Sequence, residues 1–464
     1  MKKTPIAFAL LLMIGLSGCT AMVKTPYQAP TIDVPSQFNT TLKGQQAYDV
    51  HADQWWTLFA DTNLNQLVDQ VLARNSNLAL AGINLKRARL QAELAKNQEL
   101  PRVSSGVSTG HTVNFRDGND SARGLSLSAG LSYEVDLFGK LDRQTEVAAW
   151  EAAATAEDLQ ATAQSLIATT ANLYWQLGYL NERYQNAQLS LQTSQRLYDL
   201  VRTQYRAGAV SGLELTQAEQ AIQSQQSNLS QIDQQRVQTK TALAALLQMP
   251  VQQLNVPEPA RLPEASLPTI QAGLPAEILA RRPDLRAAEL RLRKALASQD
   301  ATRAGYYPSI SLTGNVGSSS TSLTELLKNP VLTLGANLSL PFLQYNDMKR
   351  NLAISELDYE ASILNYRQTL YDAFADVETA LSDVNALSQQ VALQQRNLEL
   401  AERNEQLNEV RYRNGAIALK NVLDAQENTR NVRLSLTQMK QNLYNAHVTL
   451  LQALGGSPIQ QLPE

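Results

Sequence analysis

The chain has 464 residues, 44% of them hydrophobic, and its 40 Lys and Arg against 43 Asp and Glu give a formal net charge of -3. This balance supplies no basic field for nucleic acid, so we expect no nucleic-acid partner. Three histidines and one cysteine are too few for zinc, haem or a disulfide framework, and we expect no cofactor and no metal site. The sequence contains no nucleophile with a neighbouring base and no phosphate-binding loop, which predicts that the protein is not an enzyme.

Residues 1–18 predict a lipoprotein signal peptide. Two lysines precede an apolar run over 6–16 that is too short to span a bilayer. The Leu-Ser-Gly sequence before Cys19 resembles a bacterial lipobox, which implies cleavage before Cys19 and acylation of its thiol, as with palmitate. The alternative is an ordinary signal peptide that leaves a lone reactive thiol in an oxidising compartment. Thr20 in place of Asp favours the outer membrane by the same resemblance, and 19–62 is expected to be an extended, lipidated segment.

The next part of the chain changes its hydrophobic period from helix to strand. Residues 78–99 have a helical pattern, and Pro101 ends it. Residues 125–137 alternate strictly between apolar and polar side chains, which predicts a strand with one apolar and one polar face. Residues 103–113 form its weaker partner, and 116–120 have the composition of a turn.

A very long helix follows over 140–206. The segment contains no proline and only one glycine, so the helix is expected to extend roughly 100 Å. Apolar residues from Leu180 to Tyr205 follow a heptad rhythm, which predicts coiled-coil packing. Gly208 ends the helix, and the chain returns over 211–249. This return helix and the helix at 78–99 together nearly match the length of the long one.

The second half of the chain repeats the first at an offset of 207 residues without a gap. The sequence from Leu72 to Arg74 recurs from Leu279 to Arg281, and Gly208-Ala209 recurs as Gly415-Ala416. The second copy therefore predicts strands at 310–316 and 332–340. The predicted organisation is a repeat over 63–250, a proline-rich linker over 251–273, a second repeat over 274–457 and a tail over 458–464.

Four strands with alternating faces are typical of a membrane β-barrel, but the smallest such barrels need eight strands. An open edge in lipid would leave backbone groups unpaired, so several chains are expected to share one barrel. The long helices are then expected to continue the barrel as a second cylinder in the periplasm. The alternative for the strands is one face of a soluble β-sandwich.

The chain carries a series of short motifs in a fixed order: Trp55–Phe59, Asp136–Gly139, Arg281–Asp284, Pro308–Leu312 and two Tyr-x-x-Gly-Ala turns at Tyr205 and Tyr412. In order and spacing these motifs resemble the TolC-type outer-membrane efflux channel family, in the lipoprotein branch that serves RND-type tripartite pumps. The resemblance implies a mixed fold, mainly α with a transmembrane β part, in which a homotrimer forms a 12-stranded β-barrel continuous with a long periplasmic α-helical barrel. It implies an outer-membrane, lipid-anchored exit duct for small toxic compounds, contacting outer-membrane lipid, a periplasmic adaptor (membrane fusion) protein and an inner-membrane transporter.

The two glycine turns are the expected docking points for the adaptor. They end the longest helices, and small or apolar residues are unusual at an exposed helix end. The alternative is two ordinary glycine caps. The expected docking residues are Gly208, Ala209, Val210, Gly415, Ala416 and Ile417.

Residues just inside the turns are expected to constrict the channel. By resemblance, Glu214 and Asp424 point into the tunnel near its closed end and form acidic rings after trimerisation. Asn421, the repeat partner of Glu214, replaces an acid, and Ile417 replaces a basic residue of the family pattern. The closed state is therefore expected to be held differently, with Tyr412 reaching Glu214. The alternative is that Glu214 and Asp424 are solvated surface acids.

Glu134 and Asp136 fall on the polar face of the strand and are expected to line the barrel lumen. The sequence does not identify the cargo, because no methionine-rich path supports copper or silver. The alternatives to drug efflux are metal-ion efflux and type I protein secretion. A periplasmic adaptor is a further class, disfavoured by the two hairpins, and a structural coiled-coil lipoprotein would leave the alternating strands unexplained.

Overall fold

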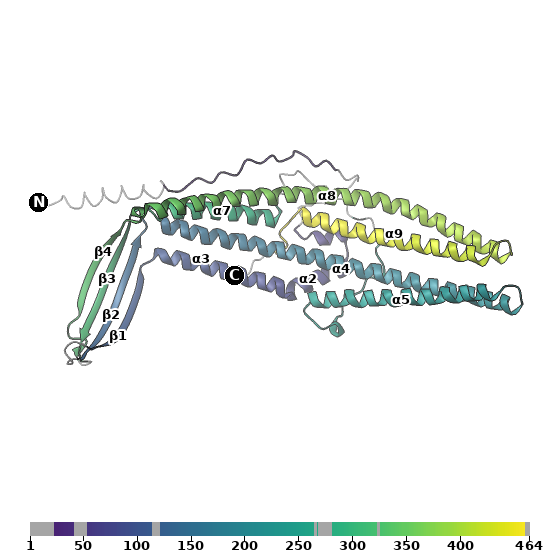
Figure 1. Ribbon diagram of the computed structural model, residues 1–464, viewed down its shortest axis with the longest axis horizontal. Helices are drawn as coiled ribbons and strands as arrows, with labels where there is room; N and C mark the ends of the chain where they lie inside the picture. The colour runs from purple at the N-terminus through teal and green to yellow at the C-terminus, as the bar shows by residue number, and fades with distance from the viewer. Residues whose placement is uncertain are drawn as a thin grey trace.

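The computed structural model describes residues 23–40, 53–113, 121–263, 267, 281–322 and 325–459. A four-stranded sheet occupies one end of the elongated molecule, and long helices run from it to two turns at the other end (Figure 1). The predicted signal peptide and Cys19 lie outside the described residues. None of the helices described is long and apolar enough to cross a membrane.

The sheet is an antiparallel meander in the order β1-β2-β3-β4. Each repeat supplies one hairpin, and the register between repeats pairs Leu131 with Gly314 and Tyr133 with Leu312. The strands are longer than the sequence pattern predicts at several ends, because main-chain pairing continues through Ser and Gly residues. Their bounds are Arg102–Val113 for β1, Ser121–Val135 for β2, Ser309–Ser320 for β3 and Val331–Ser339 for β4.

The register brings the apolar residues of all four strands onto one face. Val103 pairs with Leu131, and Ile310 pairs with Leu338, so the alternating pattern is kept across the sheet. The opposite face carries mostly Ser, Thr, Gly and Asn, as in the row Ser104, Gly130 and Asn315. Large apolar side chains remain exposed on the first face, with Val103 at 79% and Leu334 at 76%. The predicted division into an apolar and a polar face is confirmed.

Two helices of 67 and 69 residues form the long axis. The first is α4, and its bounds Lys140–Arg206 agree with the sequence prediction; at about 1.5 Å per residue it is roughly 100 Å long. Two shorter helices, α3 and α5, follow each other along it, while α7 and α9 follow each other along α8 (Figure 1). The helices are α2 (Thr62–Arg74), α3 (Ser76–Lys96), α4, α5 (Gly212–Leu246), α7 (Pro283–Ala304), α8 (Tyr345–Arg413) and α9 (Leu419–Ala453).

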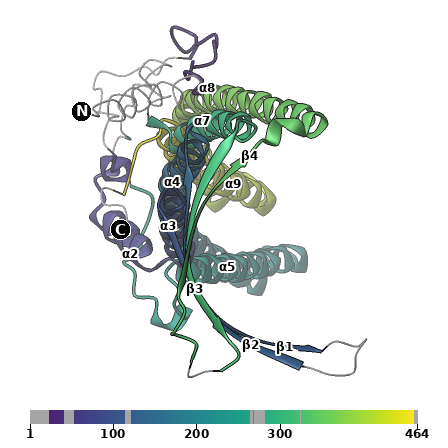
Figure 2. The same ribbon diagram turned by 90° about the vertical axis from the view of Figure 1, so that its left-hand side faces the viewer.

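Seen from the sheet end, the helices follow an arc, and α2 lies outside it (Figure 2). The main core lies at mid-height, where Trp55 and Trp56 from a short 3-10 helix (Trp55–Phe59) pack with α2 and α4. Trp175 of α4 is fully buried, and its ring lies 4.7 Å from that of Tyr444. Trp55 and Trp56 therefore pack where the chain that precedes α2 meets the long helix α4.

An extended N-terminal segment, residues 23–40, runs along the outside of α7 and α8, and we call it the N-terminal strap. Near its start the amide and hydroxyl of Thr25 each donate to the Asp300 carboxylate at 2.7 Å, and Asp300 is 1% exposed. The ring of Tyr27 stacks on the Arg293 guanidinium at 4.4 Å. At its end the amide of Thr40 donates to Glu378 at 2.9 Å. The strap is thus fixed to both helices.

Candidate docking and channel site

Both turns at the far end of the helices close with the same backbone motif. Gly208 has φ of 72° and Gly415 has φ of 70°, in the left-handed region that favours glycine. The amide of Ala209 donates to the Gln204 carbonyl, and that of Ala416 to the Arg411 carbonyl, both at 2.9 Å. Together with the glycine amides, these bonds form a Schellman motif at each helix end. The glycines are therefore helix caps, whatever else they do.

The residues expected to dock the adaptor separate into two groups. Gly208, Ala209, Gly415 and Ala416 are exposed, and a Cβ added at either glycine would meet nothing within 4 Å. Val210 and Ile417 instead are half-buried, because both pack against a small hydrophobic cluster. We call it the tip cluster; it joins the two hairpins and contains Leu197, Val201, Ala218, Tyr412, Leu419 and Val422.

Tyr412 is part of this cluster and does not make the contact that the sequence analysis expected. Its side chain is 8% exposed, and its hydroxyl donates to Gln204 Oε1 of α4 at 2.7 Å rather than to Glu214. Burial raises the pKa of the Tyr412 phenol, and the negative charge of Glu214 raises it further. Tyr412 therefore links the α8/α9 hairpin to the α4/α5 hairpin through Gln204.

Glu214 is held at the start of α5 by a capping box. The Ser211 hydroxyl accepts from the Leu213 amide at 3.2 Å, and the Glu214 carboxylate accepts from the Ser211 amide at 2.9 Å. The hydrogen bond from the Ser211 hydroxyl, with those from backbone amides, lowers the pKa of Glu214. The second turn has no such box, since Ala418 stands at the repeat position of Ser211 and Asn421 at that of Glu214. Within the protomer, Glu214 thus acts as a capping residue of α5.

Asp424 lies on the exposed surface of α9. Its side chain is 60% exposed and forms an ion pair with Lys420 at 2.5 Å, one helical turn earlier. An exposed pair of this kind contributes little to stability. The protomer therefore leaves Asp424 free to face a channel or bulk solvent, and its expected place at a constriction stays a prediction.

Only one of the two expected lumen residues belongs to the sheet. Glu134 lies on the polar face of β2, opposite Ser311, and forms an ion pair with Lys140 at 3.0 Å. The expectation for Asp136 as a strand residue is wrong, because β2 ends at Val135. Its carboxylate accepts from the Asp142 amide at 2.9 Å and so holds the first turn of α4.

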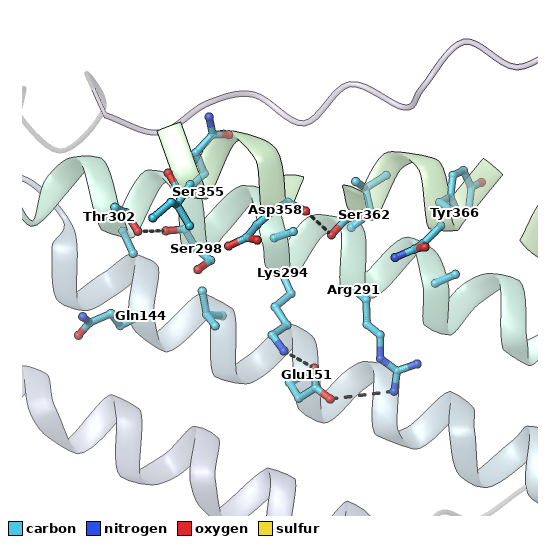
Figure 3. Close-up of a pocket in the computed structure, with 18 of the residues that line it drawn as sticks. Gln144, Glu151, Arg291, Lys294, Ser298, Thr302, Ser355, Asp358, Ser362 and Tyr366 are labelled. Atoms are coloured by element: carbon cyan, nitrogen blue, oxygen red, sulfur yellow. Dashed lines mark hydrogen bonds and ion pairs between the residues drawn. The ribbon is translucent and has the colours of Figure 1, made fainter. Parts of the chain in front are cut away.

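A polar recess lies between α4 and α8, with α7 as its floor (Figure 3). Its volume is about 1270 Å³. Arg291 and Lys294 reach from α7 towards α4, where Lys294 pairs with Glu151 at 2.8 Å and Arg291 with Asp158. The strap contacts the opposite side of α7, so the recess faces the inside of the arc. Sequence analysis missed it, because α7 and α4 are far apart in the chain.

Nothing in this recess or at the tips points to metal chemistry. Within the described part of the chain, no group of three or more His, Cys, Asp or Glu side chains is placed to hold an ion. The recess instead carries ion pairs that neutralise one another across the helices.

Comparison with known proteins then decides the family. A family model described as outer membrane efflux protein matches residues 67–248 and 274–456, and these ranges fall within the two predicted repeats. The chain belongs to the outer membrane efflux protein family. The mixed, mainly helical fold and the outer-membrane location that the sequence resemblance implied are thereby confirmed for this efflux protein, while the homotrimer stays a prediction.

Named relatives span different cargoes. The chain is 31% identical to the pyoverdine export outer membrane protein OpmQ of Pseudomonas putida, over 96% of each chain. It is 28% identical to the cation efflux system protein CusC of Escherichia coli, over 98% of this chain and 99% of that one. The open-state structure of the MtrE outer membrane channel of Neisseria gonorrhoeae superposes with a TM-score of 0.83 at 28% identity, covering 95% of this chain and 99% of that one.

Proposed function

We propose that this efflux protein works as a homotrimeric exit duct, through which small toxic compounds delivered by a periplasmic adaptor and an inner-membrane transporter leave the cell. The duct is passive, and the proposal assigns no catalytic step to the chain. The observation that carries the proposal is that, among the residues that the structure describes, both lateral sides of the protomer lack a partner, in the sheet and in the helices.

The sheet ends in two open edges, β1 and β4. Open edges expose unpaired backbone groups, which are not tolerated in lipid, so β4 of one copy has to pair with β1 of the next. Two copies would supply eight strands and three would supply twelve, and the family resemblance favours three. The apolar face of the sheet then contacts lipid, and the face with Ser, Thr and Gly contacts the lumen.

The helices carry matching apolar stripes on the same two sides. On α3 the stripe has heptad-like spacing with exposures of 57% to 64%, and on α8 Leu357 and Leu364 are each 63% exposed. Exposed leucines at this spacing are typical of a helix seam that awaits a partner. The two stripes consist of Leu80, Ile83, Leu90 and Leu94 on α3, and Leu357, Leu364 and Tyr371 on α8.

The position of the strap supports a lipid anchor at Cys19. Lys24 pairs with Glu146 at 2.8 Å, in the second turn of α4 after the sheet, and Thr25 is held by Asp300 just before β3. The chain therefore leaves the helices beside the sheet, five residues after Cys19. Radiolabelled palmitate is expected to enter the wild-type chain and not the Cys19→Ser variant.

The cargo is tested in the native host. Accumulation of antibiotics, cationic dyes and metal ions is compared with and without the gene, and with a Gly208→Glu, Gly415→Glu variant as a docking-deficient control. Accumulation of drugs and dyes is expected to rise without the gene. A rise confined to metal ions would instead favour metal-ion efflux, the second candidate, which the similarity to CusC supports.

The constriction is tested separately from the cargo. Asp424→Ala is expected to raise the conductance of the reconstituted closed channel, because it removes a charged ring that narrows the pore. Glu219→Ala, an exposed acid on α5, provides the matched control. An unchanged conductance in Asp424→Ala would return Asp424 to the class of surface acids.

A further inference from the structure

Each repeat contains one place where a short helix ends opposite the start of another. In repeat 1 the end of α5 meets the start of α3, and in repeat 2 the end of α9 meets the start of α7 (Figure 1). Such meeting points bring unpaired carbonyl groups from one helix towards unpaired amide groups of the next. The wall of the duct depends on how these two sets of groups are satisfied.

In repeat 1 the single side chain of Asn75 satisfies both helix ends. Its Oδ1 accepts from the amides of Asn77 at 2.9 Å and Leu78 at 3.3 Å, which caps the start of α3. Its Nδ2 donates to the carbonyl of Leu246 at 2.9 Å, in the last turn of α5. Asn75 is 3% exposed, so its polar atoms have no alternative partner in bulk water.

In repeat 2 the corresponding side chain is Arg282, and it contacts the corresponding carbonyl. Its Nη1 donates to the carbonyl of Ala453, which stands at the repeat position of Leu246, at 3.4 Å. A guanidinium cannot accept a hydrogen bond, so the capping role passes to Asp284, whose Oδ1 accepts from the Leu285 amide at 2.9 Å. Arg282 also donates to Asp284 Oδ2 at 2.8 Å, which joins the two halves of the arrangement.

The long helix α8 is tied to the same point. Both terminal nitrogens of Arg282 donate to Asp376 Oδ2 at 3.1 Å, and the Arg282 side chain is 11% exposed. The backbone of Arg282 has φ of -76° and ψ of 120°, close to the values of -67° and 126° for Asn75. The two residues therefore occupy equivalent places and differ only in side-chain chemistry.

We infer that Asn75 and Arg282 are the two splice residues of the duct wall: each joins two short helices end to end, so that the pair acts as one continuous strut beside a long helix. The placement of these residues in a duct wall rests on the proposed function. The splice contacts themselves lie within one protomer. Without the splice, the strut of repeat 1 loses the side-chain bond between its two halves. In repeat 2 the bond from the Gly456 amide to the Arg281 carbonyl at 2.9 Å still joins the chain after α9 to the start of α7.

Hydrogen exchange of the purified full-length protein tests the inference directly. In Arg282→Ala the amides of the first turn of α7 and the last turn of α9 are expected to exchange roughly five times faster, the size of one lost hydrogen bond. Asn75→Ala is expected to act likewise on α3 and α5. The matched control is Arg396→Ala, because Arg396 is an exposed cation paired only within α8. It is expected to leave all four helix ends unchanged.

Rescue separates a splice from a general loss of packing. Arg282→Asn places the repeat 1 solution on the same backbone geometry and is expected to restore wild-type exchange at both α7 and α9. Asn75→Asp keeps the acceptor and loses the donor, so protection is expected to fall at the end of α5 and remain at the start of α3. Unchanged exchange in Arg282→Ala, or no rescue by Arg282→Asn, would overturn the inference while leaving the trimer and efflux measurements unaffected.

Discussion

Single residues at the tips combine a structural and a docking role, and the two can be separated. Gly208 and Gly415 have positive φ, so any side chain is strained there even though the surrounding space is open. Their neighbours Val210 and Ile417 pack inwards on the tip cluster. Adaptor contact at these turns is therefore expected to fall on glycine and alanine.

Gly208→Ala is expected to lower the free energy of unfolding by about 1 kcal/mol, because alanine resists the left-handed conformation. Gly212→Ala in the same turn is the control, since its φ is not positive and alanine favours the helix it begins. Chemical denaturation of the purified protein measures both. Equal destabilisation by the two changes would contradict the strain argument.

Gly208→Glu and Gly415→Glu are expected to abolish efflux without lowering the yield of trimer, because the bulky charge blocks a surface that only a partner touches. Dye efflux in cells and native mass of the purified protein report the two effects. If the variants lose both the trimer and efflux, the glycines have only a structural role.

Glu214 makes the start of α5 sensitive to acid. Its pKa is lowered from 4.5 by hydrogen bonds present only in the folded state, so its contribution to stability is complete above that value and disappears as pH falls through the folded pKa. Exchange in the first turn of α5, corrected for the intrinsic rate, is expected to rise as the pH falls below 4.5 towards the lowered folded-state pKa. Glu214→Gln, which cannot ionise, is expected to remove this dependence.

At the scale of elements, the α4/α5 and α8/α9 hairpins have the same backbone arrangement, but their return helices begin with different caps. The helix α5 begins with a capping box, whereas α9 begins at Ala418 without a side-chain cap. Grafting the box as Ala418→Ser with Asn421→Glu is expected to stabilise the start of α9 by about 1 kcal/mol. Exchange of the first-turn amides of α9 measures this, with Ala418→Gly as the control. A graft that leaves those amides unprotected would show that another feature determines the stability of the start of α9.

The four strands and the helices α3, α4 and α5 were predictable from the sequence, whereas α2 was not predicted as a separate helix. The bounds of α4 followed from a long segment without proline that Gly208 ends, and β2 followed from strict alternation. The offset of 207 followed from residues that recur in the second half of the chain. The strap was not predictable in its contacts, since Thr25 meets Asp300 across most of the chain without any periodic pattern. The prediction that Tyr412 contacts Glu214 was wrong for the same reason. Helix packing alone brings Gln204 to the Tyr412 hydroxyl.

The splice at Arg282 could be predicted from the sequence only in part. Pro283 and Asp284 are typical of the first turn of a helix, and α7 begins at Pro283. The other part of the splice, the bond from Arg282 to the end of α9, depends on where another helix stops. Local sequence contains no information on that distance, so this part required the structure.

At the scale of the whole molecule, the unpartnered sides decide the assembly. Leu364→Arg on the α8 stripe is expected to prevent trimer formation, since a charge would be buried at a helix seam. Glu356→Arg, an exposed change on the same helix, is the control and is expected to leave the trimer intact. Native mass in mild detergent distinguishes the states. A wild-type monomer would contradict the shared barrel.

The gapless duplication limits how such a chain can change its length. One residue inserted in α4 would rotate every later side chain by about 100° and advance it by about 1.5 Å, which would misplace the heptad seam and the tip at once. An insertion of seven residues in α4 and seven in α5, with the same in α8 and α9, would keep every face in register. The duct would then be longer by roughly 10 Å, so its reach across the periplasm can change only in such steps.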